Sequence, residues 1–484
     1  MREWTREQRY RVLKDADEIR ELHERIRHSV YRQTWHVQPV TGLSSDPNGF
    51  AWYEGNWHLF YQWCPWGAVH GLKYWYHVTS KDLIHWTNEG VGMKPDTIYD
   101  NKGVHSGSAI SAGGKLYLFY TGNHRDEDWT RTPYTCVARL EEDGKPEKFP
   151  EPLFGPRPDY SEHQRDPKIF YHAERKKYYI FLGAQTRYQK GCVLVYESKQ
   201  LLEGWSFAGE LKVPGYESFG GMWECPCISN IGGKDILLFS PQYTHLPGRA
   251  GSTNHNVCLI GQMDYDTLTF TPESGYQHLD YGFDFYAAQL ASNTEDPDKS
   301  ILIAWMGLPD NHYPTESEDW EGSLTIPREL YIRKGRLIQK PISGIEALRV
   351  QELVPDGLLP EACEIEVECN GSSSGLHLFT NADGTGGMKI HYDTEQLCTI
   401  DRTAMKNRFN QEVGEVLSIP LEQPLKHLRI FIDRSSVEIF INHGEAVFTS
   451  HIYPQAEEHH YTINEPVSLK LWELCASVTD DFVI

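Results

Sequence analysis

The sequence predicts an all-β protein: a five-bladed β-propeller followed by a C-terminal β-sandwich, with a short helical extension at the N-terminus. Three observations predict it: a strand-turn-strand pattern that recurs five times before residue 345, alternating strands after residue 360, and a charged helical periodicity within the first 33 residues. A chain of 484 residues also exceeds the size at which single cores stop growing, which favours more than one domain.

Residues 1–33 are the predicted helical extension, because Ile19, Leu22, Ile26 and Val30 recur at helical spacing among Glu and Arg. This stretch is charged throughout and lacks the apolar core of a signal peptide, and no part of the chain approaches the ~20 apolar residues of a membrane span. We therefore expect a cytoplasmic protein whose extension packs on the main body and has no catalytic role.

Composition narrows the classes of partner. Lys and Arg total 46 against 68 Asp and Glu, a formal charge of −22, which repels nucleic acid and anionic membranes. An anionic substrate would need a local basic pocket. Cys225 and Cys227 are separated by one residue and lack the spacing of a zinc or redox site, so no metal and no cofactor are expected.

Five segments before residue 345 share a polar or turn motif, a short strand, a turn marked by Gly or charge, and a second apolar strand. They are DPNGFAWYEGNWHLFYQ from Asp46, SGSAISAGGKLYLFYTG from Ser106, DPKIFYHAERKKYYIFLGAQ from Asp166, ECPCISNIGGKDILLFSPQ from Glu224 and YAAQLASNTEDPDKSILIAWMG from Tyr286. Aligned on Phe60, Phe119, Phe181, Phe239 and Ala304, they repeat at spacings of 59, 62, 58 and 65 residues. This period predicts five propeller blades within residues 34–345.

Three acidic residues occupy equivalent positions in these repeats. Asp46, Asp166 and Glu224 lie 14, 15 and 15 residues before the aligned Phe. In a closed ring the first strands of the blades face the axis, so the three carboxylates should converge there. The alternative is a β-rich domain whose hairpins merely look alike, which predicts no convergence.

The pattern changes after residue 345. Residues 346–359 are expected to be a linker. Residues 360–484 are expected to form an antiparallel sandwich, because the segments EIEVEC, GLHLFT, MKIHYD, LRIFID, SVEIFI and AVFTSHIYP alternate in polarity and are separated by Gly, Asn and Asp turns. No carboxylate cluster stands out in this domain, so a structural or accessory role is favoured over a separate sugar-binding site.

Converging carboxylates suit glycoside hydrolysis, in which one carboxylate attacks the anomeric carbon and one carboxylic acid protonates the departing oxygen. Asp46 stands in an Asp-Pro-Asn-Gly turn, which would hold it rigidly near backbone amides, as a charged nucleophile requires. Glu224 lies between Trp223 and Cys225, apolar neighbours that should favour the protonated form of a general acid.

Asp166 follows Arg165, and a neighbouring cation should keep this carboxylate ionised and able to accept hydrogen bonds from sugar hydroxyls. We assign it to stabilisation of the transition state. Each carboxylate also has a structural interpretation: a turn for Asp46, an ion pair for Asp166, and a strand end beside a surface Lys for Glu224. Their shared register favours the chemical interpretation.

At these motifs the chain resembles glycoside hydrolase family 32, the invertases, fructanases and sucrose-6-phosphate hydrolases. The resemblance runs from His36 to the C-terminus and rests on HVQPVTGLSSDPNGF, LFYQ, HVTSKDLIHW, HSGSA, RDPKIF, WECP, DYGFDFYAAQ, IAWMG, SLTIPREL and DRSSVEIFINHGEAVFTSHIYP. It implies a five-bladed propeller followed by a sandwich. It also implies that Asp46 is the nucleophile that attacks the fructosyl group, Glu224 the acid/base and Asp166 the stabiliser.

The resemblance further implies a set of substrate-binding residues. Positions that line the fructose site of relatives are matched by Gln62, Ser106, Arg165 and Trp305, with Tyr286 and Asp284 as weaker candidates. Ser45 stands where the family usually has an Asn that contacts the sugar, and His70 stands where many invertases have a Trp. The Asn contact is therefore absent, although the nucleophile is intact.

The run from His70 to Lys73, together with TGNHRDEDWTRTPY, looks like the bacterial sucrose-6-phosphate hydrolases. His70, Lys73, Arg125 and Arg131 are candidates for the basic pocket that a phosphate demands of an acidic protein. The alternative for each of them is an exposed loop charge.

The resemblance thus implies a retaining β-fructofuranosidase that hydrolyses sucrose 6-phosphate, sucrose or both through a covalent fructosyl-enzyme, without metal or cofactor. An intracellular fructosidase acting on short fructo-oligosaccharides would share all three carboxylates and differ only beyond the fructose. A non-catalytic sugar-binding propeller is the alternative from another class. Its simplest mark would be loss of the acid or the nucleophile, and both are present.

Overall fold

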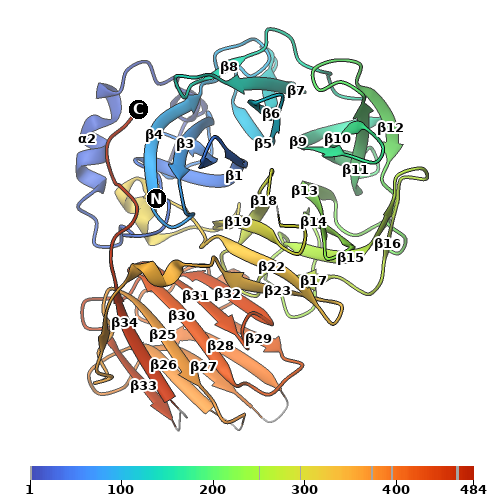
Figure 1. Ribbon diagram of the computed structural model, residues 1–484. Coiled ribbons are helices and arrows are strands. Elements are labelled where there is room, and N and C mark those ends of the chain that lie inside the picture. Colours follow the sequence, from blue (N-terminus) through green and yellow to red (C-terminus); the bar gives the residue numbers. More distant parts are fainter. Residues whose placement is uncertain (1–2, 250, 295, 372–373, 394–395, 465–467) are drawn as a thin grey trace.

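The computed structural model describes residues 3–249, 251–294, 296–371, 374–393, 396–464 and 468–484. Within these residues the chain forms a ring of five β-sheets, a two-sheet sandwich beside it and two α-helices (Figure 1). The fold class predicted from the sequence is confirmed.

Each blade is an antiparallel sheet, and the first strands of neighbouring blades contact one another around the axis (Figure 1). The blade strands are β1 (Gly42–Tyr53), β2 (Asn56–Cys64), β3 (Tyr74–Ser80), β4 (Trp86–Met93); β5 (Val104–Ala112), β6 (Lys115–Arg125), β7 (Arg131–Leu140), β8 (Pro146–Lys148); β9 (Tyr160–His172), β10 (Lys177–Thr186), β11 (Gly191–Ser198), β12 (Ser206–Glu210); β13 (Met222–Ile231), β14 (Lys234–Gln242), β15 (Val257–Asp264), β16 (Thr269–Pro272), β17 (Gln277–His278); and β18 (Tyr286–Leu290), β19 (Ser300–Met306), β21 (Ser323–Leu324), β22 (Arg328–Arg333), β23 (Arg336–Pro341).

Two-residue turns join the first and second strands in three of the blades. Both turn residues have positive φ at Glu54-Gly55, Gly113-Gly114 and Gly232-Gly233. This geometry matches the right-handed twist of the flanking strands, which is why the turns contain glycine. The repeated pattern in the sequence therefore reflects hairpins of one kind.

The ring closes where its last segment meets its first blade. β20 (Trp320–Glu321) pairs in parallel with the start of β1, and Ala51 forms a bridge with Ser292. These contacts join residues more than 200 positions apart. Strand β1, which carries Asp46, is thereby bound to residues from the end of the propeller sequence.

The sandwich consists of a six-stranded sheet, in the order β24-β34-β25-β30-β31-β32, and a five-stranded sheet, in the order β29-β28-β27-β26-β33. Its strands are β24 (Arg349–Leu353), β25 (Ala362–Glu368), β26 (Ser374–Thr380), β27 (Gly387–Tyr392), β28 (Leu397–Ala404), β29 (Val416–Pro420), β30 (His427–Asp433), β31 (Ser436–Ile441), β32 (Ala446–His451), β33 (His460–Asn464) and β34 (Ser468–Leu474). β24 lies inside the expected linker, because its backbone pairs with β34. The sandwich therefore begins earlier than predicted.

Both chain ends pack against blade 1 (Figure 1). Helix α2 (Asp17–Ile26) buries Ile19, His23 and Ile26 on one face, whereas Val30 of the predicted periodicity lies beyond the helix and is exposed. The last residues leave the sandwich, in which we expected them, and Ser477 and Val483 accept hydrogen bonds from the blade. Among the residues described, no helix is both long and apolar enough to cross a membrane.

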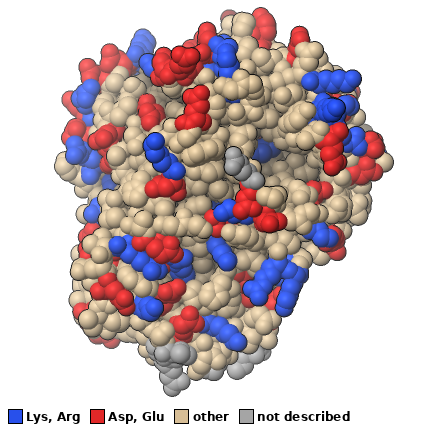
Figure 2. Space-filling model, in the orientation of Figure 1, with Lys and Arg blue, Asp and Glu red and all other residues tan. Residues whose placement is uncertain are grey.

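A buried network of charges joins the propeller to the sandwich. Arg328 of β22 donates to Asp280 at 2.9 Å and to Glu438 of β31 at 2.7 Å. His36 lies between Asp433 and Glu438, at 2.9 and 3.2 Å. On the face shown in Figure 2, acidic and basic side chains lie interspersed over both domains.

Candidate active site

The first strand of every blade carries a β-bulge, where it advances one residue further than its partner strand. The bulges lie at residues 44–47, 105–107, 165–168, 224–227 and 286–289. Asp166, Cys225 and Ala287 have positive φ values of 66°, 49° and 51° within them. Non-glycine residues adopt this conformation at a cost, and bulges re-aim side chains beside active sites. The backbone of the first strands is therefore bulged at the positions where the predicted site residues lie.

Asp46 is held by donors from two blades. The Ser106 hydroxyl donates to Asp46 Oδ2 at 2.5 Å, and the Gln62 amide donates to the same oxygen at 3.3 Å. Asn48 accepts a hydrogen bond from the amide of Gly107 at 2.9 Å, which fastens β1 to blade 2. The predicted turn at Asp46-Pro47-Asn48-Gly49 is wrong, because these residues lie within strand β1 at two successive β-bulges. The first of these bulges, and not a turn, orients the Asp46 carboxylate.

Glu224 uses both of its carboxylate oxygens. Arg165 donates to Oε1 through Nε at 2.9 Å and through a terminal nitrogen at 2.6 Å, while the Tyr286 hydroxyl donates to Oε2 at 2.6 Å. The prediction of apolar surroundings for Glu224 is therefore wrong, because Arg165 and Tyr286 reach it from neighbouring blades. The predicted pairing of Arg165 with Asp166 is wrong for the same reason.

Asp166 is almost fully buried, and its Oδ2 accepts a hydrogen bond from the amide of Cys225 at 3.0 Å. Burial raises the pKa of this carboxyl to about 7; Arg165 opposes the shift, and the charges of Glu224 and Asp46 add to it. The charges of both Glu224 and Asp46 influence the pKa of Asp166, so the three carboxylates lie close together, as the register of the repeats predicted. They meet from blades 1, 3 and 4.

His163 completes the support of Arg165, and we did not predict it. Its Nδ1 lies 2.8 Å from a terminal nitrogen of Arg165 and accepts from it, since a guanidinium has only donors. Burial lowers the pKa of His163 to about 4, with Arg165 adding to the shift. The two residues are two positions apart on β9, a spacing that places side chains on one face and could have indicated the pair.

The side of the site beyond Asp46 is cationic. The Lys73 ammonium donates to Gln62 and, at 3.3 Å, to the Ser45 hydroxyl. His70 packs edge-on against Trp305 with ring centroids 5.9 Å apart, and burial lowers the pKa of His70 to about 3, with Lys73 contributing. Ser45 therefore lies beside a cation that donates to it.

Arg125 and Arg131 face each other across the β6–β7 hairpin. Burial lowers the pKa of Arg131 to about 10, and the charges of Arg165 and Arg125 lower it further. His105, also not predicted, has a pKa well below its usual value through burial and the charges of Lys73 and Arg131. A positive field therefore surrounds this part of an otherwise acidic protein.

Trp305 and Tyr286 form the floor of the site. They pack with Cys225 in one apolar cluster, and the Tyr286 hydroxyl remains directed at Glu224. The contacts of the predicted residues form two groups. One group contains Ser45, Asp46, Gln62, Lys73 and Ser106. The other contains His70, Arg165, Glu224, Tyr286 and Trp305, and Asp166 adjoins it through the amide of Cys225.

Asp284, a weaker candidate, lies elsewhere. It is fully buried, and it accepts hydrogen bonds from the Tyr313 hydroxyl at 2.7 Å and from the amide of His451 of the sandwich at 2.9 Å. The family resemblance suggested it for the site, but its side chain points to the domain boundary. Asp284 is therefore not a site residue.

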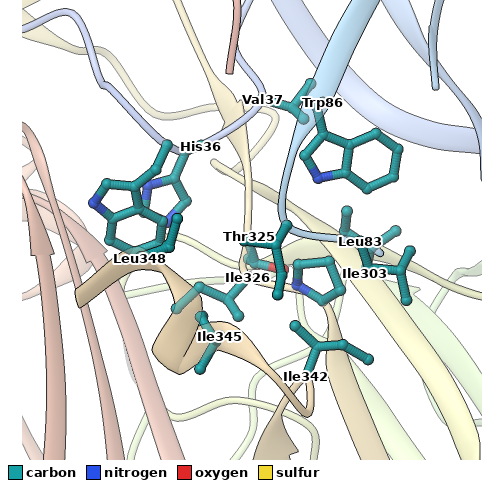
Figure 3. A pocket seen from close by; sticks show the side chains of 13 residues that line it. His36, Val37, Leu83, Trp86, Ile303, Thr325, Ile326, Ile342, Ile345 and Leu348 are labelled. Carbon is teal, nitrogen blue, oxygen red and sulfur yellow. The ribbon is translucent and has the colours of Figure 1, made fainter. Parts of the chain in front are cut away.

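An apolar cavity between blades 1 and 5 offers no rival site. Trp86, Ile303, Ile342 and other apolar side chains point into it beside η2 (Ile345–Leu348) (Figure 3). Its volume is about 20 Å³, which is room for about one water molecule and none for a sugar. Nor does any group of three or more His, Cys, Asp or Glu residues in the described chain form a metal-binding arrangement.

Comparison with known proteins accounts for both domains. Residues 36–341 match the family description "Glycosyl hydrolases family 32 N-terminal domain", and residues 343–473 match "Glycosyl hydrolases family 32 C terminal". The chain belongs to glycosyl hydrolase family 32. The predicted family is thereby confirmed, and so is the prediction that the protein is a glycoside hydrolase.

Relatives within family 32 match over nearly the whole chain. A sucrose-6-phosphate hydrolase of Staphylococcus xylosus is 39% identical, covering 94% of each chain. The structure of a sucrose-6-phosphate hydrolase from Lactobacillus gasseri has a TM-score of 0.91 at 36% identity and covers 98% of this chain and 100% of its own. A Bombyx mori β-fructofuranosidase, solved in complex with sucrose, has a TM-score of 0.82 at 30% identity and covers 96% and 100%.

Proposed function

We propose that this family 32 protein is a retaining β-fructofuranosidase that hydrolyses sucrose 6-phosphate, and sucrose less efficiently, in the cytoplasm. The observation that carries the proposal is the division of the site into two parts. Three carboxylates converge at the axis, and a set of cations lies beside Asp46. The names of the relatives from Staphylococcus xylosus and Lactobacillus gasseri support the same substrate.

In the first step the Asp46 carboxylate attacks the anomeric carbon of the fructosyl group. The bond from that carbon to the glucosyl oxygen breaks, and this oxygen takes a proton from Glu224. Ser106 and Gln62 hold the attacking oxygen of Asp46 in place. The product is a fructosyl ester of Asp46, and the glucose part leaves.

In the second step Glu224 takes a proton from water, whose oxygen attacks the same carbon and releases Asp46. Tyr286 and Arg165 fix the position of Glu224 for both proton transfers. Asp166 contacts the sugar hydroxyls and stabilises the transition state. Because two displacements restore the configuration, NMR of the first-formed fructose should show the β-anomer; an α-anomer would show inversion.

The phosphate group is assigned to the cationic side of the site. Lys73 and Arg131 supply charge, and His70 shapes the wall beside Trp305. A buried cation with a lowered pKa gains most when an anion arrives, because each favours the charged form of the other. Lys73→Met and Arg131→Met should each lower kcat/KM for sucrose 6-phosphate by about 10- to 100-fold.

A fructosidase of short fructo-oligosaccharides would keep the same three carboxylates. Comparing kcat/KM for sucrose 6-phosphate, sucrose and kestose separates the two functions. Equal values for the first two substrates would remove the phosphate assignment, and a preference for kestose would favour the fructosidase.

A further inference from the structure

The first residues of the chain contact the two parts of the protein that carry the cations of the site. Residues 4–13, which include α1 (Arg6–Arg9), lie across the loop of residues 65–73 and beside the tip of the β6–β7 hairpin. The loop carries His70 and Lys73, and the hairpin carries Arg125 and Arg131. The segment thus contacts both parts of the chain that supply the cations.

Arg9 binds the loop through its side chain and its backbone. Its Nε donates to the carbonyl oxygen of His70 at 2.7 Å, and its own carbonyl oxygen accepts from the amide of Leu72 at 2.8 Å. The approach is so close that a Cβ on Gly71 would lie 2.2 Å from the Arg9 oxygen. Only glycine fits there, so the loop is built to receive this segment.

Residues 4–13 contact the hairpin at Trp129, which lies at its tip. Tyr10 meets the Trp129 ring edge-on, with centroids 5.0 Å apart, and the Arg6 guanidinium lies over the same ring at 4.5 Å. Trp129 in turn accepts a hydrogen bond from Arg125 through its carbonyl oxygen at 2.5 Å. The segment therefore contacts Trp129, which binds Arg125, and it contacts Leu72, which precedes Lys73 in the chain.

We propose that residues 4–13 determine the preference for the phosphorylated substrate, with Arg9 and Tyr10 as positioning residues. Arg9 sets the loop that carries His70 and Lys73, and Tyr10 sets the hairpin that carries Arg125 and Arg131. Because both are held by one short segment, the spacing between the two groups of cations is fixed before substrate arrives, which lowers the cost of binding a phosphate. This inference rests on the proposed phosphate site, and it gives the extension a positioning role while leaving it without a catalytic residue.

The test measures kcat and KM for sucrose 6-phosphate and for sucrose in Arg9→Gln, Tyr10→Ala and a control, Arg27→Gln. Arg27 belongs to the same extension, its side chain is 51% exposed, and it contacts Glu24 at 3.5 Å. We expect Arg9→Gln and Tyr10→Ala to raise KM for sucrose 6-phosphate about tenfold, with a smaller change for sucrose, whereas Arg27→Gln behaves as wild type. Equal losses on both substrates, or no change, would overturn the proposal.

Two double variants test whether Arg9 acts on substrate preference through Lys73. If Arg9 acts through Lys73, Arg9→Gln should add little to the loss caused by Lys73→Met, but should add fully to the loss caused by Arg131→Met. Full additivity with both would contradict that route. Thermal melting of each variant checks that the segment has not simply unfolded the protein.

The two proposals fail in different ways. If wild-type protein shows no preference for sucrose 6-phosphate over sucrose, the phosphate site is wrong and this inference is wrong with it. If the wild type and Lys73→Met behave as proposed but Arg9→Gln and Tyr10→Ala keep the wild-type ratio of the two substrates, only the inference fails.

Discussion

Buried carboxylates gather in two regions of the protein: the boundary between propeller and sandwich, and the axis of the propeller. At the boundary, Glu438 accepts hydrogen bonds from Arg328, His36 and the amide of Ile326. At the axis, Asp166 accepts from the amide of Cys225, while the nearest guanidinium, Arg165, is bonded to Glu224 instead.

Two buried carboxyls, Glu438 at the boundary and Asp166 at the axis, have pKa values that are shifted in opposite directions, although burial also raises the pKa of Asp280 at the boundary. Burial acts to raise the pKa of Glu438, but Arg328 and His36 outweigh it, and the pKa is lowered. Burial raises the pKa of Asp166, and Arg165 does not overcome it. Buried carboxylates that are hydrogen-bonded to a buried cation act as structural groups, because removing the cation would leave a charge unpaired. A buried carboxylate without such a bond is kept in place by the packing around it, and it is available for chemistry. The same residue types therefore serve structure in one place and function in the other.

The largest effect should come from the axis. Asp46→Asn removes the nucleophile while keeping its shape, so kcat should fall by about 10⁴-fold or more with little change in melting temperature. Release of fructose and thermal melting measure the two quantities. A loss of less than tenfold would mean that Asp46 is not the nucleophile.

Breaking the boundary cluster should affect stability. Arg328→Met leaves Asp280 and Glu438 buried without their cation, and it should lower the free energy of unfolding by about 3–5 kcal/mol. Lys406→Met, which removes an exposed partner of Glu457, is the control and should leave the free energy of unfolding almost unchanged. Urea unfolding measures both, and similar values for the two would contradict the comparison.

Asp166→Asn should stabilise the protein while abolishing activity. Because the folded pKa of Asp166 is raised from 3.8 to about 7, the wild type loses stability as pH rises between these values. Asn carries no charge to bury, so the variant should gain on the order of 1–3 kcal/mol at pH 8 and almost nothing at pH 4. Urea unfolding at the two pH values tests this; a destabilised variant at pH 8 would refute it.

The smallest effect concerns His36. Burial acts to lower its pKa, but Asp433 and Glu438 outweigh burial and raise it. Its contribution to stability is therefore complete below the unfolded pKa of 6.5 and is lost as pH rises through the folded value. The urea midpoint of the wild type should fall over this range, and that of His36→Gln should fall less, because only the contribution of Asp166 remains in the variant. Parallel curves would show that another group titrates.

The sequence predicted more about the axis than about the boundary. Asp46, Asp166 and Glu224 share a register within repeats, and a closed ring converts equal register into proximity. Asp284 and Arg328 have no such repeat. Their partners His451 and Glu438 come from the other domain, so only the packing of the domains could identify them.

By itself the sequence determined the number of blades and the convergence of three carboxylates, because strand periodicity and turn chemistry are local and repeat along the chain. Its motifs, by resemblance, indicated the family. Only the tertiary structure decided which carboxylate receives Arg165. Arg165 and Asp166 are adjacent in the chain, but the bulge at residues 165–168 and the approach of blade 4 turn the guanidinium toward Glu224. The neighbour of a side chain in space is set by packing between blades, and this left Asp166 buried without a cation of its own.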